Sequence, residues 1–135
     1  MANLFELEII TPQRKEYTGS VQSVSCPGES GRFQILYNHA PFLATLAVGL
    51  AKVIDAEGNT IQYAISGGSA QVFHNQMRVL ANAAERSDSI DVARAEAAKR
   101  RAEERLKSHT EDIDSERVRL ALLRAINRLK VAGEG

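Results

Sequence analysis

In the first part of the chain, apolar and polar residues alternate along short segments. Phe5, Leu7 and Ile9 are separated by two glutamates, which is the period of a strand with one buried face. Further runs of this kind lie at residues 21–25, 32–36, 50–54, 60–66, 70–73 and 77–82. Turn-forming residues, among them Gly67-Gly68, separate these runs, and no helical period interrupts them. The pattern therefore predicts an antiparallel β-sandwich or barrel.

Near residue 90 the spacing of apolar residues changes to that of a helix. Asp88 or Ser89 is the expected N-cap, and Asp91 is expected in the first turn, where the helix dipole favours a negative charge. Two narrow apolar stripes follow, separated by a short polar connection at residues 108–114. The first stripe consists of Ala95, Ala98, Ala102 and Leu106, and the second of Val118, Leu122, Ala125 and Leu129. We therefore expect an antiparallel two-helix hairpin after the sandwich, which makes the chain an α+β protein.

Charge density divides the chain at the same place. Eleven of the 34 charged residues lie in the first 83 positions, and 23 lie in the last 52. We therefore predict two domains, residues 1–84 and residues 85–135. Because the first helical stripe is mostly alanine, its burial contributes about 1 kcal/mol or less for each methyl covered. We expect the hairpin to dock weakly and reversibly.

Composition and charge exclude several classes of protein. The chain of 135 residues has one cysteine, Cys26, which leaves no internal disulfide and no cysteine-rich zinc site. Its 17 basic residues balance its 17 acidic residues, unlike the charge of a typical nucleic-acid binder. Acidic residues near the start argue against a secretory signal, and the longest mostly apolar run, residues 40–51, is too short to span a bilayer. We expect any membrane association to go through a partner.

Catalytic and metal-binding patterns are weak in this sequence. His39, His74 and His109 are scattered along the chain and lack the spacing of a zinc site. A nucleophilic enzyme needs a cysteine or serine, a base and a third group that orients the base, and Cys26 has no such pattern around it. The glycine pair within residues 66–69 could hold a phosphate, but between two strand patterns it is more simply a turn. We therefore predict no catalytic residue and no metal site.

Several longer strings carry a resemblance to a known family. They are Gly28–Pro41 (GESGRFQILYNHAP) with Leu46 and Gly49, Ile65–Gly68 (ISGG) with Ala70–Val72 (AQV), Ala84–Arg86 (AER), Ile90–Ala95 (IDVARA) and Leu120–Leu129 (LALLRAINRL). In this order, over nearly the whole chain, they resemble the epsilon subunit of the F-type, proton-translocating ATP synthase. One departure is Phe33-Gln34, where the family often has a small hydrophobic residue followed by glycine.

The resemblance implies a non-catalytic rotor subunit of the central stalk. In this family the sandwich binds the gamma subunit and rests on the ring of c subunits, which couples rotation to proton flow. The ring-facing loop would consist of Glu29, Ser30, Gly31 and Arg32.

The resemblance also implies that the hairpin regulates the enzyme. It either folds down on the sandwich or extends along gamma towards the catalytic alpha and beta subunits, where it inhibits ATP hydrolysis. The cations of the inhibitory helix, which would meet an acidic loop of beta, are Arg117, Arg119, Arg124, Arg128 and Lys130. From spacing alone, this run of cations also fits a solvated helix face.

Several bacterial members of the family bind ATP as a regulatory ligand through an IDxxRA motif, which is intact here. The resemblance assigns Ile90 to this site as part of the motif. It places Glu85, Asp91 and Arg94 at the adenine end, and Arg101, Arg124 and Arg128 near the phosphates. Arginine suits phosphate because its planar fork makes paired hydrogen bonds to phosphate oxygens. From spacing alone, Asp91 also fits a helix start and Arg94 a solvated position. No cofactor is required.

The residues alone leave a second class of function open. The chain could be a free-standing interaction module whose basic hairpin clamps an acidic protein or a nucleic acid, with steep salt dependence in the latter case. The resemblance instead implies gamma, the c ring and the alpha and beta subunits as partners, and no nucleic acid. It also implies a peripheral position on the cytoplasmic face of a bacterial plasma membrane, with the stromal face of a thylakoid as an alternative.

Overall fold

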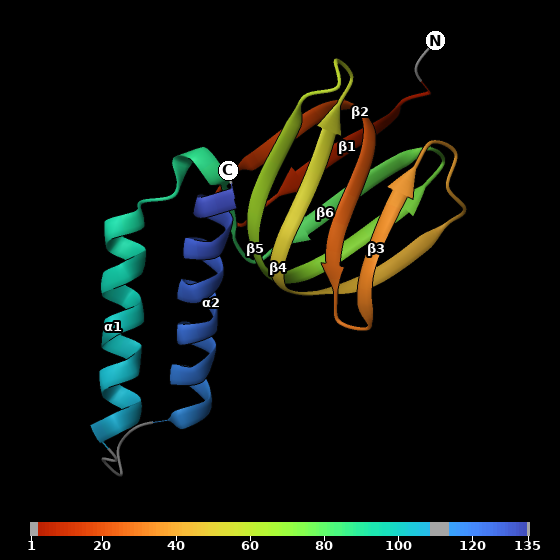
Figure 1. Cartoon of the computed structure of the whole chain (residues 1–135). Coiled ribbons are helices and arrows are strands. Elements are labelled where there is room, and N and C mark those ends of the chain that lie inside the picture. Colours follow the sequence, from red (N-terminus) through yellow and green to blue (C-terminus); the bar gives the residue numbers. More distant parts are fainter. Residues whose placement is uncertain (1–2, 109–113, 135) are drawn as a thin grey trace. The chain divides into compact units, whose positions relative to one another are not determined.

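The structure is a computed structural model that describes residues 3–108 and 114–134. Its strands, in chain order, are β1 (Phe5–Ile10), β2 (Lys15–Gly28), β3 (Gly31–Leu36), β4 (Phe42–Asp55), β5 (Thr60–Phe73), β6 (Gln76–Ala81) and β7 (Ala84–Arg86) (Figure 1). Among the described residues they join in one sheet in the order β1-β6-β5-β4-β2-β3, with β7 added to β5. Because β1 also pairs with β2, the sheet closes on itself.

The predicted fold class is confirmed, with one exception in strand direction. Within the described part of the chain, β1 pairs with β6 in parallel, and the other strand pairs are antiparallel. Strands β2 and β4 begin earlier than the alternation predicted, at Lys15 and Phe42. The short strand β7 was not predicted.

The hydrophobic core lies inside the closed sheet. Phe5, Leu7 and Ile9 are each at most 2% exposed, which confirms the alternation predicted for the first strand. Burial of each such side chain contributes about 1.5–3 kcal/mol. The other large, fully buried side chains of this core are Val21, Val24, Ile35, Val53, Tyr63, Ile65, Met77 and Val79. Every strand from β1 to β6 therefore has residues in one continuous core.

The turn predicted at Gly67-Gly68 is wrong, because β5 runs through it as one strand. Both glycines have a positive φ, 91° and 130°. A Cβ added to Gly68 would lie 2.1 Å from the carbonyl oxygen of Leu80, so the two backbones approach too closely for any side chain. At this point β5 changes its partner from β7 to β6. The glycines thus allow a bend within a strand rather than a reversal of the chain.

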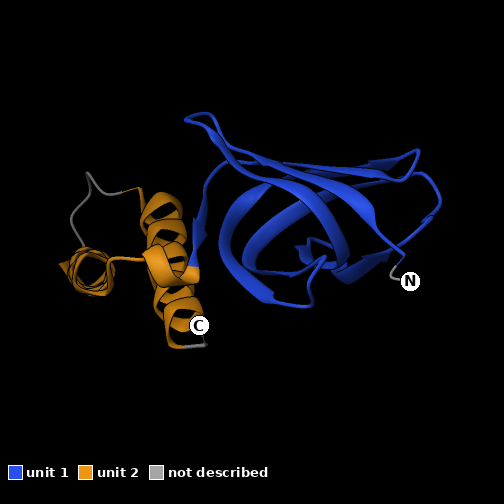
Figure 2. Cartoon of the chain, turned by 90° about the horizontal axis from the view of Figure 1, so that it is seen from above, with its two compact units in different colours: residues 1–86 blue, residues 87–135 orange. Residues whose placement is uncertain are grey.

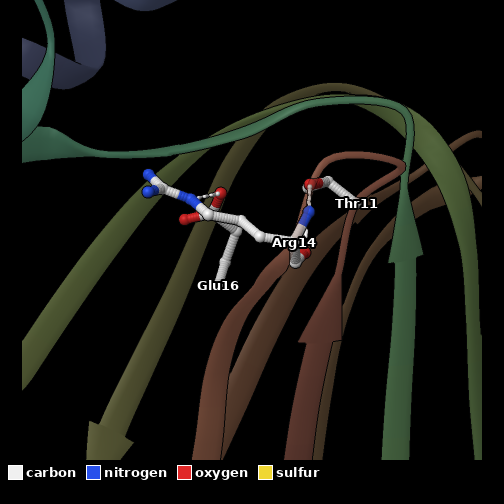
Figure 3. A network of polar contacts seen from close by, with 3 residues as sticks. All are labelled: Thr11, Arg14 and Glu16. Carbon is white, nitrogen blue, oxygen red and sulfur yellow. Dashed lines mark hydrogen bonds and ion pairs between the residues drawn. The ribbon is translucent and has the colours of Figure 1, made fainter.

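The turn between β1 and β2 is closed by a buried threonine. The Thr11 backbone N–H donates to the Arg14 carbonyl at 2.9 Å, and the Arg14 N–H donates to Thr11 Oγ1 at 3.3 Å. Arg14 Nε also pairs with Glu16 Oε1 at 2.8 Å, and this exposed ion pair raises the pKa of the Arg14 guanidinium (Figure 3). These contacts satisfy the polar groups of a turn whose threonine is only 7% exposed.

The second part of the chain is helical. It contains a short 3₁₀ helix, η1 (Ser87–Ser89), and two helices, α1 (Val92–Ser108) and α2 (Ser115–Glu134). The N-cap of α1 is Asp91, whose carboxylate accepts the Arg94 N–H at 3.0 Å. The expectation that Asp88 or Ser89 caps this helix is therefore wrong, because η1 takes up both residues. Asp114 caps α2 in the same way through the Arg117 N–H at 3.2 Å.

The two helices pack against each other through the predicted stripes (Figure 1). Ala95, Ala102 and Ala125 are at most 4% exposed, and Val118 is 8% exposed. The remaining stripe residues are half-buried: Ala98, Leu106, Leu122 and Leu129. The antiparallel hairpin is thus confirmed, while its connection at residues 109–113, with His109, lies outside the described residues. Its packing depends on small side chains, which limits the apolar area that holds the helices together.

The chain forms two compact units, Met1–Arg86 and Ser87–Gly135 (Figure 2). The first unit ends two residues after the boundary predicted from charge density, because β7 pairs with β5. In that pairing Glu85 lies opposite Ala64 and Arg86 opposite Tyr63. Each unit has its own buried apolar residues.

Candidate functional sites on the two units

The loop between β2 and β3 is a two-residue hairpin turn. Gly28 pairs with Gly31, which leaves Glu29 and Ser30 at the tip. Gly31 has a φ of 129°, in the region that favours glycine. The Glu29 N–H donates to the Thr45 carbonyl on β4 at 2.9 Å. The four residues expected in the ring-facing loop therefore lie together, all exposed, on a tip that is anchored to β4.

Arg32, the last residue of this loop, forms hydrogen bonds within the chain. Its Nη1 donates to the Leu50 carbonyl on β4 at 2.7 Å, and its Nη2 donates to Ser25 Oγ on β2 at 3.0 Å. The guanidinium therefore links β3 to both β2 and β4. Sequence reasoning missed this role, because the two partners lie 7 and 18 residues away along the chain.

One outward face of the closed sheet is rich in apolar side chains, and sequence reasoning missed it. Leu43 on β4, Phe73 on β5 and Leu80 on β6 are 74%, 53% and 45% exposed. In register, Leu43 lies opposite Gln71, and Leu80 lies opposite Ser69. Because alternate residues of a strand share a face, these side chains lie on one surface, which we call the β4–β6 face. The sequence does contain a sign of this face. In each of these three strands, a large apolar residue stands at a position where the alternation predicts an outward-facing polar residue.

Charged residues border the β4–β6 face at β1. A hollow of about 380 Å³ runs beside Phe73 and is lined by residues of β1, β2, β5 and β6. At its edge Glu8 pairs with Lys15 at 2.8 Å and with Arg78 at 3.2 Å. The hydrogen bond from Lys15, followed by the contacts of Arg78, holds the pKa of the Glu8 carboxyl below its ordinary value. An apolar surface with a charged rim is typical of a protein-binding site.

The candidate nucleotide residues are distributed over both compact units. Glu85 lies in β7 of the first unit. The others belong to the helical unit: Ile90 and Asp91 before α1, Arg94 and Arg101 on α1, and Arg124 and Arg128 on α2. Since the helices are antiparallel, the first turn of α1 and the second half of α2 lie at the same end of the hairpin (Figure 1).

Two of these candidates are only partly available to a ligand. Ile90 is 8% exposed, so little of its side chain is accessible to a ligand. Asp91 uses one carboxylate oxygen to cap α1. The side chains of Arg94, Arg101 and Arg124 are exposed. These arginines are accessible to an anion, whereas Arg128 is half-buried.

The five cations of α2 fall on two faces of the helix. Arg117, Arg124 and Arg128 follow the spacing i, i+7, i+11 and form the first face. Arg119 and Lys130 share the second face with two exposed apolar residues, Leu123 and Ile126, at i, i+4, i+7, i+11. Arg119 also pairs with Glu116 at 3.0 Å. The first face follows from the spacing in the sequence, and the helix presents beside it a second face that is both basic and apolar.

In the described part of the chain, the side chains considered for catalysis take part in packing. Cys26 is fully buried, and this burial raises the pKa of its thiol to about 12, which disfavours the reactive thiolate. His39 and His74 pack edge-on against Phe42 and Phe73, respectively. Within residues 3–108 and 114–134, no three His, Cys, Asp or Glu residues are grouped so as to hold a metal ion. The helices of that same part of the chain are too short or too polar to cross a membrane.

Comparisons with known proteins agree with this division into two units. The family model for the β-sandwich domain of the ATP synthase delta/epsilon chain matches residues 4–87. The model for the long α-helix domain of the same chain matches residues 88–133. The chain belongs to the ATP synthase delta/epsilon family.

Relatives in this ATP synthase family match the chain over nearly its whole length. An ATP synthase epsilon chain of Pelotomaculum thermopropionicum is 52% identical over 128 residues, which covers 95% of each chain. An ATP synthase epsilon chain of Bacillus pumilus is 44% identical, over 96% of this chain and 97% of the relative. The resemblance recognised in the sequence is thereby confirmed.

Solved structures support the same fold. A chain in the mitochondrial ATP synthase of Euglena gracilis, solved as OSCP/F1/c-ring, superposes with a TM-score of 0.77 at 22% identity. The match covers 98% of this chain and 82% of that chain. At this identity the similarity concerns the fold alone.

Proposed function

We propose that the chain is the epsilon subunit of the central stalk of a rotary ATP synthase and has no active site of its own. Its first unit would bind gamma and rest on the c ring, so that rotation and proton flow stay coupled. The observation that carries the proposal is the β4–β6 face, where Leu43, Phe73 and Leu80 expose apolar surface above a charged rim. Family membership favours this function over a free-standing interaction module.

Binding to purified gamma tests the β4–β6 face. The variant Leu43→Asp is expected to weaken this binding at least about tenfold, because a charge on an apolar contact must be desolvated without a partner. Leu43 is 74% exposed, so the substitution leaves the core intact. The matched control is Leu36→Asp on β3, where the leucine is 51% exposed outside this face. Equal binding by wild type and Leu43→Asp would contradict the assignment of this face to gamma.

The helical unit is proposed to inhibit ATP hydrolysis. Its hairpin would exchange between a folded-down state and a state extended along gamma towards the alpha and beta subunits. Narrow stripes of alanine support this proposal, since a small buried area makes alternative dockings similar in free energy. The exposed cations of α2 would meet acidic residues of beta. Reconstitution of the catalytic core with and without the chain measures the inhibition directly.

We further propose that ATP is a regulatory ligand of the helical unit. Asp91 and Arg94 lie three residues apart at the start of α1, and Arg124 and Arg128 lie four apart on α2. Each pair shares a helix face, and both lie towards the same end of the hairpin. A nucleotide held by both helices would favour the compact hairpin through its higher affinity for that state, so ATP would relieve inhibition.

Titration of the isolated chain with ATP, followed by calorimetry and NMR, tests this proposal. We expect binding that weakens at least about tenfold in Arg94→Ala and in Arg128→Ala, since each removes a charge-assisted contact. Arg119→Ala is the control, because Arg119 lies on the other face of α2. The role of Asp91 is tested with Asp91→Asn, which keeps the N-cap that alanine would remove. The absence of any calorimetric or NMR response at millimolar ATP would contradict ATP sensing.

In the cell, the chain is proposed to lie peripherally at the membrane through its partners, on the cytoplasmic face of a bacterial plasma membrane or the stromal face of a thylakoid. Fractionation gives a direct measurement. The chain should leave washed membranes together with gamma and the catalytic subunits.

A further inference from the structure

The register between β2 and β4 shifts beside the β2–β3 turn. Ser25 pairs with Lys52, whereas Gly28 pairs with Leu46. Three steps along β2 thus correspond to six along β4, and the extra residues of β4 bulge where the turn begins. A bulge interrupts the regular ladder of hydrogen bonds, so the backbone groups in this interval need other partners.

Pro27 occupies this interval on β2 and has no N–H to donate. It lies against β4 so closely that a Cβ on Gly49 would meet the Pro27 Cβ at 2.6 Å. The neighbouring carbonyl of Leu50 instead accepts a hydrogen bond from Arg32 Nη1 at 2.7 Å. Arg32 stands opposite Pro27 in the β2–β3 register, which aims its side chain across the proline-containing segment. The guanidinium therefore supplies a donor at the position where the proline cannot.

The planar fork of the guanidinium makes this link directional. While Nη1 binds the carbonyl of β4, Nη2 binds Ser25 Oγ on β2 at 3.0 Å. Together with the bond from the Glu29 N–H to the Thr45 carbonyl, this gives the hairpin two side-by-side contacts with β4, one within the bulged interval at Leu50 and one beyond its end at Thr45. Two anchors at separate points fix the angle of the hairpin as well as its position.

We infer that Arg32 is a positioning residue: it holds the β2–β3 hairpin at a fixed angle, and Glu29 and Ser30 at the tip make the contact with the partner. The inference rests on the proposed function in so far as the partner is the c ring. Of the four residues expected in the ring-facing loop, Arg32 is thereby moved from a contact residue to a positioning residue. The charge of Arg32 acts within the chain, and the charge offered to the partner is that of Glu29.

Amide hydrogen exchange on the free, full-length chain tests the anchoring. In Arg32→Ala the Glu29 N–H is expected to exchange at least about tenfold faster, because the hairpin then keeps one anchor on β4. Ser25→Ala removes one of the two bonds and should give a smaller increase in the same direction. This milder variant still tests the inference if Arg32→Ala fails to fold. Ser30→Ala, at the tip, is the control and should leave the rate unchanged.

Arg32→Lys separates anchoring from charge. Lysine keeps the positive charge, but its single ammonium group cannot reproduce the fork that reaches both Leu50 and Ser25. We expect its exchange rate to approach that of Arg32→Ala. An exchange rate at Glu29 equal to wild type in both Arg32→Ala and Ser25→Ala would overturn the inference.

The assembled ATP synthase distinguishes a failure of this inference from a failure of the proposed function. The readout is the number of protons pumped per ATP hydrolysed, which we expect Arg32→Ala and Arg32→Lys to lower alike. One outcome would show that Arg32 contacts the ring through its charge. In that outcome Arg32→Ala loses coupling, Arg32→Lys keeps full coupling, and the exchange rate at Glu29 is unchanged in both variants. The inference would then be wrong. If exchange rises but coupling is unaffected, even in Glu29→Gln, the anchoring role stands and the ring-facing assignment of the loop is wrong.

Discussion

Removal of every residue after Arg86 is expected to leave a cooperatively folded β protein that still binds gamma. All seven strands of the described chain lie before this point, and so does the core of the closed sheet. The helical unit would be lost with its arginines. The truncated subunit should therefore support coupled ATP synthesis but should no longer inhibit ATP hydrolysis. The measurements are urea unfolding of the free chain, binding to gamma, and both activities of the reconstituted enzyme.

A second truncation, after Ala83, is the control for the position of the boundary. It removes β7, which covers the edge of β5 at Tyr63, Ala64 and Ile65. These residues are at most 5% exposed, so their uncovering should lower the free energy of unfolding by about 1–3 kcal/mol. Aggregation or loss of cooperative unfolding in the longer fragment, the one ending at Arg86, would show that the first unit does not fold on its own.

The strands could be predicted where one face of the sheet meets the core and the other meets solvent. Phe5, Leu7 and Ile9 show this alternation because their neighbours Glu6 and Glu8 face outward. The same reasoning failed at Gly67-Gly68. A glycine pair has the same sequence signature in a turn and in a bend within a strand, and what distinguishes them is the backbone of Leu80, which approaches from another strand. Information of that kind is not local in the sequence.

The start of α1 illustrates a second limit. Asp88, Ser89 and Asp91 can all accept backbone N–H groups, so composition alone does not choose among them. The 3₁₀ turn Ser87–Ser89 uses the first two, and the cap falls to Asp91. This matters for the candidate ATP site, since the aspartate of the IDxxRA motif has a structural task even without a ligand.

The candidate sites were predictable to the extent that they depend on short motifs. The four residues of the expected loop are contiguous at an exposed tip, and the arginines of α2 lie outside the stripe that packs on α1. The bonds of Arg32 could not be predicted, because they depend on a bulge in β4. The β4–β6 face escaped notice for a related reason. Three exposed apolar residues on different strands become one surface only when the register of the sheet is known.

Reversal of two charges on α2, in the double variant Arg124→Glu and Arg128→Glu, is expected to raise ATP hydrolysis by the assembled enzyme. If this face docks on acidic residues of beta, each reversal removes an attraction of about 0.2–1 kcal/mol and adds a repulsion of similar size. Together these changes amount to roughly 1–4 kcal/mol, which lowers the equilibrium constant for docking in the inhibited state at least about fivefold. The measurement is the steady-state rate of hydrolysis at low and high salt. Salt should relieve inhibition in the wild type more than in the variant, because it screens the attraction.

The control for this experiment uses the other face of the same helix. Arg119→Glu with Lys130→Glu reverses the same number of charges beside Leu123 and Ile126, so it changes the net charge equally. Inhibition through the face of Arg117, Arg124 and Arg128 predicts a much larger effect of the first pair. Equal effects of both pairs would mean that net charge, rather than a docked face, governs inhibition. Unchanged hydrolysis in the first variant, with the subunit still bound, would mean that inhibition does not use these arginines. They would then serve the nucleotide site or remain solvated.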